Sequence, residues 1–206
     1  EDMMAAHGGT VIPHTVDIRD AEAVEAMIGT IWQAGPLDGL VNNAAGNFVA
    51  RTEDLSSRAF DAIANTVLHG TFYCTNACGK RWIAEGRAAS ILNILVTWVW
   101  TGSPYVVPFA MSKAGVAVMT KSLAVEWGPY GIRVNAIAPS AVVTEGTLQF
   151  FGDKWDRAAG VIRDRQSLKR TLETEDLAGT VIYLASDASK FHTGDSVVID
   201  GGYSIF

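Results

Sequence analysis

The sequence is poor in cysteine, in basic residues and in long apolar runs, and each shortage excludes a class of protein. Two cysteines in 206 residues, Cys74 and Cys78, supply neither a disulfide framework nor a metal site. Their i, i+4 spacing instead indicates two small apolar residues in a helical core. A net charge of −6 lacks the basic surface that non-specific nucleic-acid binding needs. We therefore expect no metal and no nucleic-acid partner.

No apolar run is long enough to span a bilayer. The richest stretch, residues 91–107, is interrupted by polar side chains and by Gly102 and Pro104, so it indicates a strand followed by a loop. The first four residues, Glu-Asp-Met-Met, do not show the basic-then-apolar pattern of a signal peptide. We expect the cytoplasm as the compartment and no membrane partner. A hydrophobic content of 49% suits one core in a single domain over residues 1–206.

Strand patterns alternate with helical patterns along the chain. Strands are predicted at residues 10–18, 37–41, 90–96, 132–138 and 196–199. Helices are predicted after Asp20, from Ser56 to Trp82, from Pro108 to Trp127, and after Thr174. This alternation indicates right-handed βαβ units around a parallel sheet, so the fold class is α/β.

Three motifs carry a resemblance to a known family. Ser112-Lys113-Ala114-Gly115 is followed by residues 123–128, Leu-Ala-Val-Glu-Trp-Gly, and by residues 132–135, Ile-Arg-Val-Asn. Together they resemble the short-chain dehydrogenase/reductase family. That resemblance implies a Rossmann-like, doubly wound parallel sheet in three αβα layers. It also implies a nicotinamide cofactor, NADP or NAD. The runs at residues 44–48 and 101–108 resemble the 2,4-dienoyl-CoA reductase subgroup most.

The glycine-rich phosphate turn that opens this kind of fold has no counterpart here. Gly8-Gly9 lacks the further glycine of that turn, and a strand pattern follows it rather than a helix. In the resembled family two strands and two helices precede the segment that matches residues 10–18. We therefore expect a chain that lacks the first two strands of the family, and a strand at residues 10–18 without its natural neighbour.

The resemblance implies a set of cofactor-binding residues along the chain. Asp17 and Ile18 would meet the adenine, although Asp17 can equally be a turn residue before the helix cap. The corner Asn43-Ala44-Ala45-Gly46 would line the adenine–ribose side, where small residues allow close approach to the backbone. The loop after the fourth predicted strand would cover the nicotinamide. The further residues implied are Val67, Lys113, Pro139, Ser140, Val142 and Thr144.

The proton-donor positions of the family are altered in this chain. Phe109 stands where the family has the tyrosine of its Tyr-x-x-x-Lys pair. Trp98 stands at the relay tyrosine of the dienoyl-CoA reductases, and Val96 at the usual serine. None of these three side chains has an ionisable proton. Lys113 is the surviving catalytic residue that the resemblance implies.

Two further side chains are candidate acids. Tyr105 is the nearest phenol to Lys113 in sequence, although an apolar wall is its simpler role. His69 falls on the helix position that holds the thioester oxygen in the subgroup, although a lone helix histidine is commonly structural. We expect weak or altered activity.

The function predicted is NAD(P)H-dependent reduction of an unsaturated or oxo acyl thioester, so the partner is an acyl-CoA-like small molecule. The alternative is an impaired member of the family that acts as an oligomer scaffold or ligand binder. The two long helices and the last strand are the family's dimer and tetramer surfaces, which predicts a homodimer or homotetramer. The aromatic-rich residues 148–161 are predicted to form a mobile substrate lid or a dimer contact.

Overall fold

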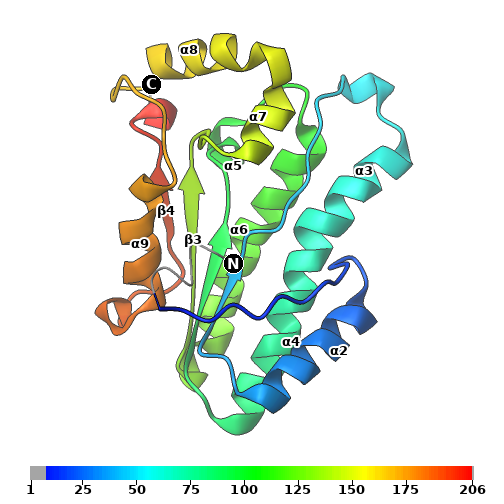
Figure 1. Cartoon of the computed structure of the whole chain (residues 1–206), viewed down its shortest axis with the longest axis vertical. Helices are drawn as coiled ribbons and strands as arrows, with labels where there is room; N and C mark the ends of the chain where they lie inside the picture. Colours follow the sequence, from blue (N-terminus) through cyan, green and yellow to red (C-terminus); the bar gives the residue numbers. More distant parts are fainter. Residues whose placement is uncertain (1–7, 206) are drawn as a thin grey trace.

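Four parallel strands form one sheet in the computed structural model, which describes residues 8–205 (Figure 1). The strands are β1 (Gly39–Asn42), β2 (Ala89–Ile94), β3 (Ile132–Pro139) and β4 (Ser196–Ile199), in the order β1-β2-β3-β4. Near-continuous apolar strands such as β2 are typical of a sheet covered on both faces. Four predicted strands are confirmed.

The strand predicted at residues 10–18 is wrong. Residues 9–17 have no regular secondary structure, and a turn follows at Ile18 and Arg19. A parallel strand needs a neighbour for its backbone groups, and no strand of the described chain pairs with this segment. Val16 and Ile18 instead pack their side chains against the core. In Figure 1 the segment runs as a coil across the middle of the molecule toward α2 (Ala21–Ala34).

Helices cover both faces of the sheet. On one face, α2, α4 (Gly70–Glu85) and α6 (Val107–Trp127) bury a cluster that includes Trp82, Ile91 and Trp127. On the other face, α9 (Glu175–Ala185) packs Leu184 against Leu92 and Ile137. Successive residues of β2 thus point into opposite layers. The predicted three-layer αβα fold is confirmed.

Helix caps explain where several of these helices begin. The Asp20 side chain accepts the backbone N–H groups of Glu22 and Ala23 at the start of α2, as predicted. Ser56 accepts the N–H of Ala59 at the start of α3 (Ser57–Ala64). Thr174 precedes α9, but its hydroxyl donates to the Glu175 carboxylate and does not cap the backbone.

The long helix predicted from Ser56 to Trp82 contains a π-helical turn. The turn η2 (Asn65–His69) lies between α3 and α4, and the N–H of Gly70 bonds to the carbonyl of Asn65. Ile63 before the turn and Val67 within it pack against Phe109 of α6. After it, residues such as Cys78 and Trp82 pack into the main core. π-turns inside helices are frequent near functional sites.

Short helices gather at the carboxyl ends of the strands. They are α5 (Trp98–Thr101), α7 (Glu145–Phe151) and α8 (Trp155–Arg165), with the 3₁₀ turns η4 (Gly152–Lys154) and η6 (Tyr203–Ile205). In Figure 1, α7 and α8 lie above the ends of the strands. Three further 3₁₀ turns are η1 (Thr52–Asp54), η3 (Gly128–Tyr130) and η5 (Asp187–Ser189). Across residues 8–205, none of the helices combines the length and hydropathy that a membrane crossing requires.

Candidate active site

Lys113 lies at the carboxyl end of the central strands. Pro108 stands in the first turn of α6, where a missing N–H costs nothing. Further along the helix, Val116 and Ala117 pack against Leu95 and Ala136, which fixes the helix on the sheet. The Lys113 side chain is consequently buried, and its ammonium donates a hydrogen bond to the carbonyl of Ile94, the last residue of β2.

Burial changes the protonation of this amine. Loss of water around the ammonium lowers the pKa of Lys113 from 10.5 to about 8. Its Nζ lies 5.6 Å from the centre of the Phe109 ring, which offers the cation a π face but no hydrogen-bond acceptor. An amine with a pKa this close to neutrality can both donate hydrogen bonds and exchange a proton at physiological pH.

Strand register places Lys113 between two loops that were predicted to hold the cofactor. Asn42 pairs with Asn93 in the register of β1 and β2, so Ile94 lies level with Asn43, the first residue of the corner. In the register of β2 and β3, Ile94 pairs with Ile137, two residues before Pro139. Ligands bind at this edge in open parallel sheets. The corner, the amine and the Pro139 loop therefore share the ligand-binding end of the sheet.

The corner Asn43–Gly46 offers an accessible backbone. All four of its residues are exposed, and a Cβ added to Gly46 would meet nothing within 4 Å. The preceding residue is firmly held, because Asn42 Nδ2 donates to Thr75 Oγ1 at 2.9 Å and to Asn93 Oδ1 at 2.8 Å. Asn93 in turn donates to Thr120 Oγ1 on α6 at 2.9 Å. A buried polar network thus connects the corner to the helix that carries Lys113.

The loop after β3 is tied to neighbouring segments. Ser140 donates its backbone N–H to the Ile199 carbonyl at 3.1 Å, and its φ is not positive, so serine fits where the family has glycine. Val142 forms a bridge with Leu172. The Thr144 hydroxyl caps α7 by accepting the N–H of Thr147 at 3.1 Å. Pro139 itself is buried at the end of β3.

Asp17, Ile18 and Val67, which were predicted to bind the cofactor, make contacts with other residues of the protein. Asp17 forms a two-pronged ion pair with Arg19, which lowers the pKa of the Asp17 carboxyl to about 2. Ile18 packs on Gly70, where its Cδ1 would lie 2.7 Å from an added Cβ. The Val67 side chain is fully buried beside Phe109, and its carbonyl accepts the Thr71 hydroxyl at 2.7 Å.

Among the described residues, no hydrogen bond joins His69 or Tyr105 to Lys113. His69 lines a separate depression with Leu68, Phe72, Tyr73 and Met119. Met119 and Lys113 are six residues apart on α6, so their side chains point about 120° apart around the helix. Tyr105 is 54% exposed and has a φ of 66°, and its carbonyl accepts the N–H of Ala50 at 3.0 Å.

The three altered proton-donor positions form one apolar cluster beside Lys113. The Trp98 ring meets the Phe109 ring edge to face, with their centres 6.1 Å apart. Val96 packs against the same cluster. Aromatic edges and aliphatic groups exclude water around the amine but transfer no proton. Lys113 is therefore the ionisable side chain beside this apolar cluster.

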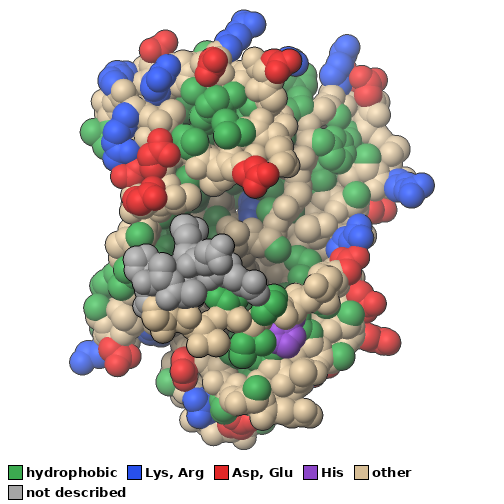
Figure 2. Space-filling model, in the orientation of Figure 1, with side chains coloured by type: hydrophobic (Ala, Val, Ile, Leu, Met, Phe, Trp, Pro, Cys, Tyr) green, Lys and Arg blue, Asp and Glu red, His purple; other side chains and the backbone are tan. Residues whose placement is uncertain are grey.

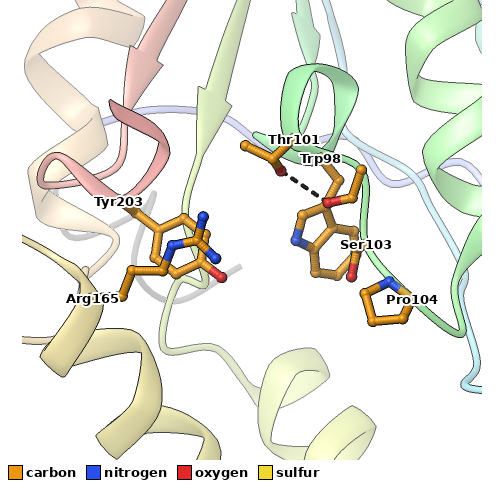
Figure 3. A pocket seen from close by; sticks show the side chains of 7 residues that line it. Trp98, Thr101, Ser103, Pro104, Arg165 and Tyr203 are labelled. Carbon is orange, nitrogen blue, oxygen red and sulfur yellow. Dashed lines mark hydrogen bonds between the residues drawn. The ribbon is translucent and has the colours of Figure 1, made fainter. Parts of the chain in front are cut away.

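A cavity of about 410 Å³ opens on the other side of Trp98 (Figure 3). Its walls come from α5, the loop after α5, the end of α8 and the turn η6, and the lining residues are Trp98, Thr101, Gly102, Ser103, Pro104, Arg165 and Tyr203. The volume is in the range of small-molecule sites. Figure 2 shows that the face below α7 and α8 is hollowed across its middle.

Sequence reasoning missed Arg165 and gave Tyr203 no chemical role. In the structure, the Arg165 guanidinium lies 4.5 Å from the centre of the Tyr203 ring. Arg165 belongs to no local motif, and only the fold brings these two residues to the same cavity as Ser103. The Asn93 network was also missed, although a lone asparagine within the apolar run at residues 91–95 was a usable signal.

Comparison with known proteins identifies relatives of the whole described chain. The family model described as Enoyl-(Acyl carrier protein) reductase matches residues 1–204. A probable 2,4-dienoyl-CoA reductase from Caenorhabditis elegans is 38% identical over 210 residues, covering 100% of this chain and 68% of the relative. A probable 2,4-dienoyl-CoA reductase from Bacillus subtilis is 37% identical over 196 residues, covering 94% of this chain and 77% of the relative.

Solved structures agree with these relatives. A gluconate 5-dehydrogenase from Burkholderia cenocepacia in complex with NADP and tartrate has a TM-score of 0.92 at 27% identity, covering 100% of this chain and 80% of that one. A short chain dehydrogenase from Bacillus anthracis has a TM-score of 0.82 at 40% identity, covering 92% and 73%. The fold, the Lys113 helix and these likenesses agree: the chain belongs to the short-chain dehydrogenase/reductase family and is homologous to its 2,4-dienoyl-CoA reductases.

Proposed function

We propose that the protein is an NAD(P)H-dependent oxidoreductase that reduces an unsaturated or oxo acyl thioester. The observation that carries this proposal is the position of Lys113, whose buried amine lies at the carboxyl edge of the sheet between the Asn43–Gly46 corner and the Pro139 loop. The likeness to proteins named 2,4-dienoyl-CoA reductases supports the substrate class.

The residues at this edge suit a dinucleotide. The exposed backbone of the corner can approach the adenine–ribose side closely, because Gly46 presents no side chain. Lys113 would donate a hydrogen bond to a ribose hydroxyl, and Val142 and Thr144 would contact the carboxamide and a phosphate. When bound, the nicotinamide supplies the hydride. We favour NADP, with NAD as the alternative.

The chain's own residues then position the acceptor and handle its charge. Hydride addition to a conjugated thioester places negative charge on the thioester oxygen, which needs donors aimed at it. Phe109 and Trp98 would keep water from the side of the acceptor that faces their rings, and the Lys113 ammonium would supply a positive charge. Loss of one main donor costs about 10²–10³ in rate in enzymes that stabilise an oxyanion. We therefore expect slow turnover.

A turnover assay tests this function. The protein is incubated with NADPH and a 2,4-dienoyl thioester, and loss of nicotinamide absorbance is followed while cofactor binding is measured by fluorescence. Slow turnover that Lys113→Met abolishes supports the proposal. Absence of both turnover and NADPH binding rejects it in favour of a scaffold or ligand-binding role.

A gain-of-function variant tests the geometry. Phe109 and Lys113 lie one turn apart on α6, and Phe109→Tyr would place a phenol beside the amine. Carbonyl reductase activity should appear or rise in this variant, whereas the control Phe72→Tyr, on an exposed position of α4, should change nothing. Unchanged activity of Phe109→Tyr with normal cofactor binding contradicts the assigned helix face.

The proposal extends to assembly and compartment. α4 and α6 expose the large apolar side chains Phe72, Met111, Val118 and Val125, which are 48–80% accessible. Surfaces of this kind are typical of protein–protein contacts, so we propose a homodimer or homotetramer through these helices in the cytoplasm. Light scattering of the wild type and of Val118→Glu, together with localisation of the tagged protein, would test both statements.

A further inference from the structure

A tyrosine, a histidine and an aspartate lie in line at the amino end of β4, away from Lys113. Tyr183 belongs to α9, and His192 and Asp195 belong to the loop that leads into β4. The Tyr183 hydroxyl lies 3.2 Å from His192 Nδ1, and His192 Nε2 lies 2.9 Å from Asp195 Oδ2. In Figure 1 this loop lies below α9, at the end of the sheet opposite to α7 and α8. Phenol, imidazole and carboxylate thus form one hydrogen-bonded chain.

The carboxylate determines the direction of both hydrogen bonds. An ionised carboxylate only accepts, so His192 Nε2 carries a hydrogen and donates it to Asp195. In the neutral imidazole Nδ1 then has no hydrogen, and the Tyr183 hydroxyl donates to it. The imidazole is therefore placed to take the phenol proton, and the charge of Asp195 would stabilise the imidazolium that forms. This is how a general base activates a hydroxyl nucleophile.

A buried asparagine holds the loop that carries the histidine and the aspartate. Asn135 of β3 is fully buried. Its Nδ2 donates to the His192 carbonyl at 2.8 Å, and its Oδ1 accepts the N–H of Asp195 at 3.2 Å. Between these two residues Gly194 makes the turn with a φ of 80° and donates its N–H to the Val134 carbonyl at 2.8 Å. The imidazole and the carboxylate are therefore positioned by the sheet itself.

A positive charge lies close to the phenol. The Arg133 guanidinium donates to the carbonyls of Leu184 and Ser186, which follow Tyr183 at the end of α9. Burial lowers the pKa of Arg133, and the charges of Asp187 and Tyr183 oppose this effect. The attraction is mutual, so the guanidinium favours the negative charge that develops on the phenol oxygen as its proton leaves.

The tyrosine is accessible, and its neighbours in sequence are apolar. Tyr183 is 40% exposed, so a reagent in solution can reach its side chain. Ile182 and Phe191, which precede Tyr183 and His192, are 67% and 103% exposed. Exposed apolar side chains of this kind favour a reagent that also has an apolar part.

We propose that Tyr183 is a second reactive site of the protein, a nucleophile that accepts an apolar acyl group from an activated carboxylic ester. The phenol oxygen forms a bond to the carbonyl carbon, the bond from that carbon to the leaving oxygen breaks, and the phenol proton passes through His192 to the leaving group. The products are an O-acyl tyrosine and an alcohol, so no oxidant or reductant is needed. The inference does not depend on the proposed reductase function, and its test uses neither cofactor nor thioester.

Acylation by p-nitrophenyl octanoate tests the proposal. The full chain is incubated with the ester, and the acylated residues are identified and timed by peptide mass spectrometry. Tyr105 and Tyr130 are internal controls, because they are 54% and 50% exposed and their hydroxyls have no hydrogen-bond partner among the described residues. Tyr183 should be acylated at least about 10-fold faster than either control. Labelling of the three tyrosines in proportion to their exposure overturns the proposal.

Variants of the histidine and the aspartate test the relay. His192→Gln removes the base, so acylation of Tyr183 should fall by about 10²-fold. Asp195→Asn should also lower it, whereas Asp195→Glu keeps the carboxylate and should retain most of the rate. His14→Gln is the control, because His14 is an exposed histidine far from α9 in the sequence. Unchanged labelling of Tyr183 in His192→Gln, or an equal loss in Asp195→Asn and Asp195→Glu, overturns the relay.

The length of the acyl chain tests the reagent class. p-Nitrophenyl acetate should favour Tyr183 over Tyr130 several-fold less than the octanoate does, because it offers little apolar surface. Phe191→Ser, at a fully exposed position, should reduce the preference for the octanoate. Equal selectivity with both esters overturns the assignment of an apolar acyl group.

Discussion

The two halves of the ligand-binding edge are held very differently. In the half carried by α6, Phe109, Ser112 and Lys113 are buried, and Thr120 shares a hydrogen bond with Asn93. In the other half, the Asn43–Gly46 corner and Asp17 are exposed. The chain spans about two thirds of the length of the Caenorhabditis elegans relative. The first group is buried where α6 packs on the strands, whereas the second group lies in loops and stays exposed.

The largest effect is expected where α4 packs closely on α6, in the buried half of the molecule. A Cβ on Gly79 would lie 2.3 Å from the Trp127 ring, and both residues are buried. Gly79→Ala should therefore lower the free energy of unfolding by about 3 kcal/mol through overpacking. Urea unfolding measures the change. In α8, Gly160 has open space around it, so the control Gly160→Ala should stabilise the protein by up to about 1 kcal/mol. Similar results for the two variants would refute the tight α4–α6 contact.

The buried amine should give stability a measurable pH dependence. The Lys113 pKa is about 8 in the folded protein and 10.5 in an exposed lysine. Between these values the unfolded chain binds more protons, so the free energy of unfolding should rise as pH increases from 8 to 10.5, by about 2–3 kcal/mol. Lys113→Met should lose this rise. The control Lys121→Met, at an exposed position of α6, should keep it. Parallel pH curves for all three proteins would show that Lys113 is not desolvated.

Tyr105 lies where the two halves of this edge meet, because its carbonyl accepts the N–H of Ala50, which follows the Asn43–Gly46 corner. A substitution at Tyr105 therefore tests how this junction is held. A φ of 66° costs a non-glycine residue about 1–2 kcal/mol, and asparagine tolerates it better. Tyr105→Asn should therefore stabilise the protein by about 0.5–1 kcal/mol. Tyr130 is similarly exposed but has no positive φ, so Tyr130→Asn should bring no gain in thermal or urea unfolding. A destabilised Tyr105→Asn would mean that the ring makes contacts worth more than the strain.

The smallest effect is expected where α4 meets the N-terminal segment. A Cβ on Gly70 would lie 2.7 Å from Ile18 Cδ1, a clash comparable to that at Gly79. Ile18 lies in a turn that follows residues 9–17, which have no strand partners, so its aliphatic side chain can move aside more easily than the Trp127 ring. Gly70→Ala should change the free energy of unfolding by less than about 0.5 kcal/mol, with helix propensity offsetting the clash. A loss as large as that of Gly79→Ala would show that this segment is as rigid as α6.

Local patterns in the sequence predicted most of the fold. Apolar runs placed four strands, and Asp20 and Ser56 marked helix starts through side-chain caps that the structure contains. The prediction of a strand at residues 10–18 was wrong because β-branched residues favour a strand only where a neighbouring strand can pair with it. The π-helical turn at residues 65–69 could not be read from a pattern of period 3.6, because its extra residue is set by packing on both sides.

The candidate site was predictable to the extent that it lies in continuous motifs. Lys113, the Asn43–Gly46 corner and the Pro139 loop lie at one edge because parallel strands end together. Their cofactor contacts stay predictions. Arg165 and Ser103 are separated by 62 residues and line one cavity only because of the fold, so no window of sequence could pair them. The Trp98–Phe109 contact was equally invisible before the helix and the loop were placed.

The π-helical turn has a consequence for how this region tolerates insertions and deletions. One surplus residue in a helix turns the residues before it by about 100° relative to the residues after it. Deleting one residue from Asn65–His69 would restore a regular α-helix, yet it would swing Ile63 away from the aromatic ring of α6 that it now supports. A single-residue deletion inside this turn would therefore leave the helical hydrogen bonds nearly intact. It would nevertheless remove the packing of Ile63 on Phe109, next to Lys113.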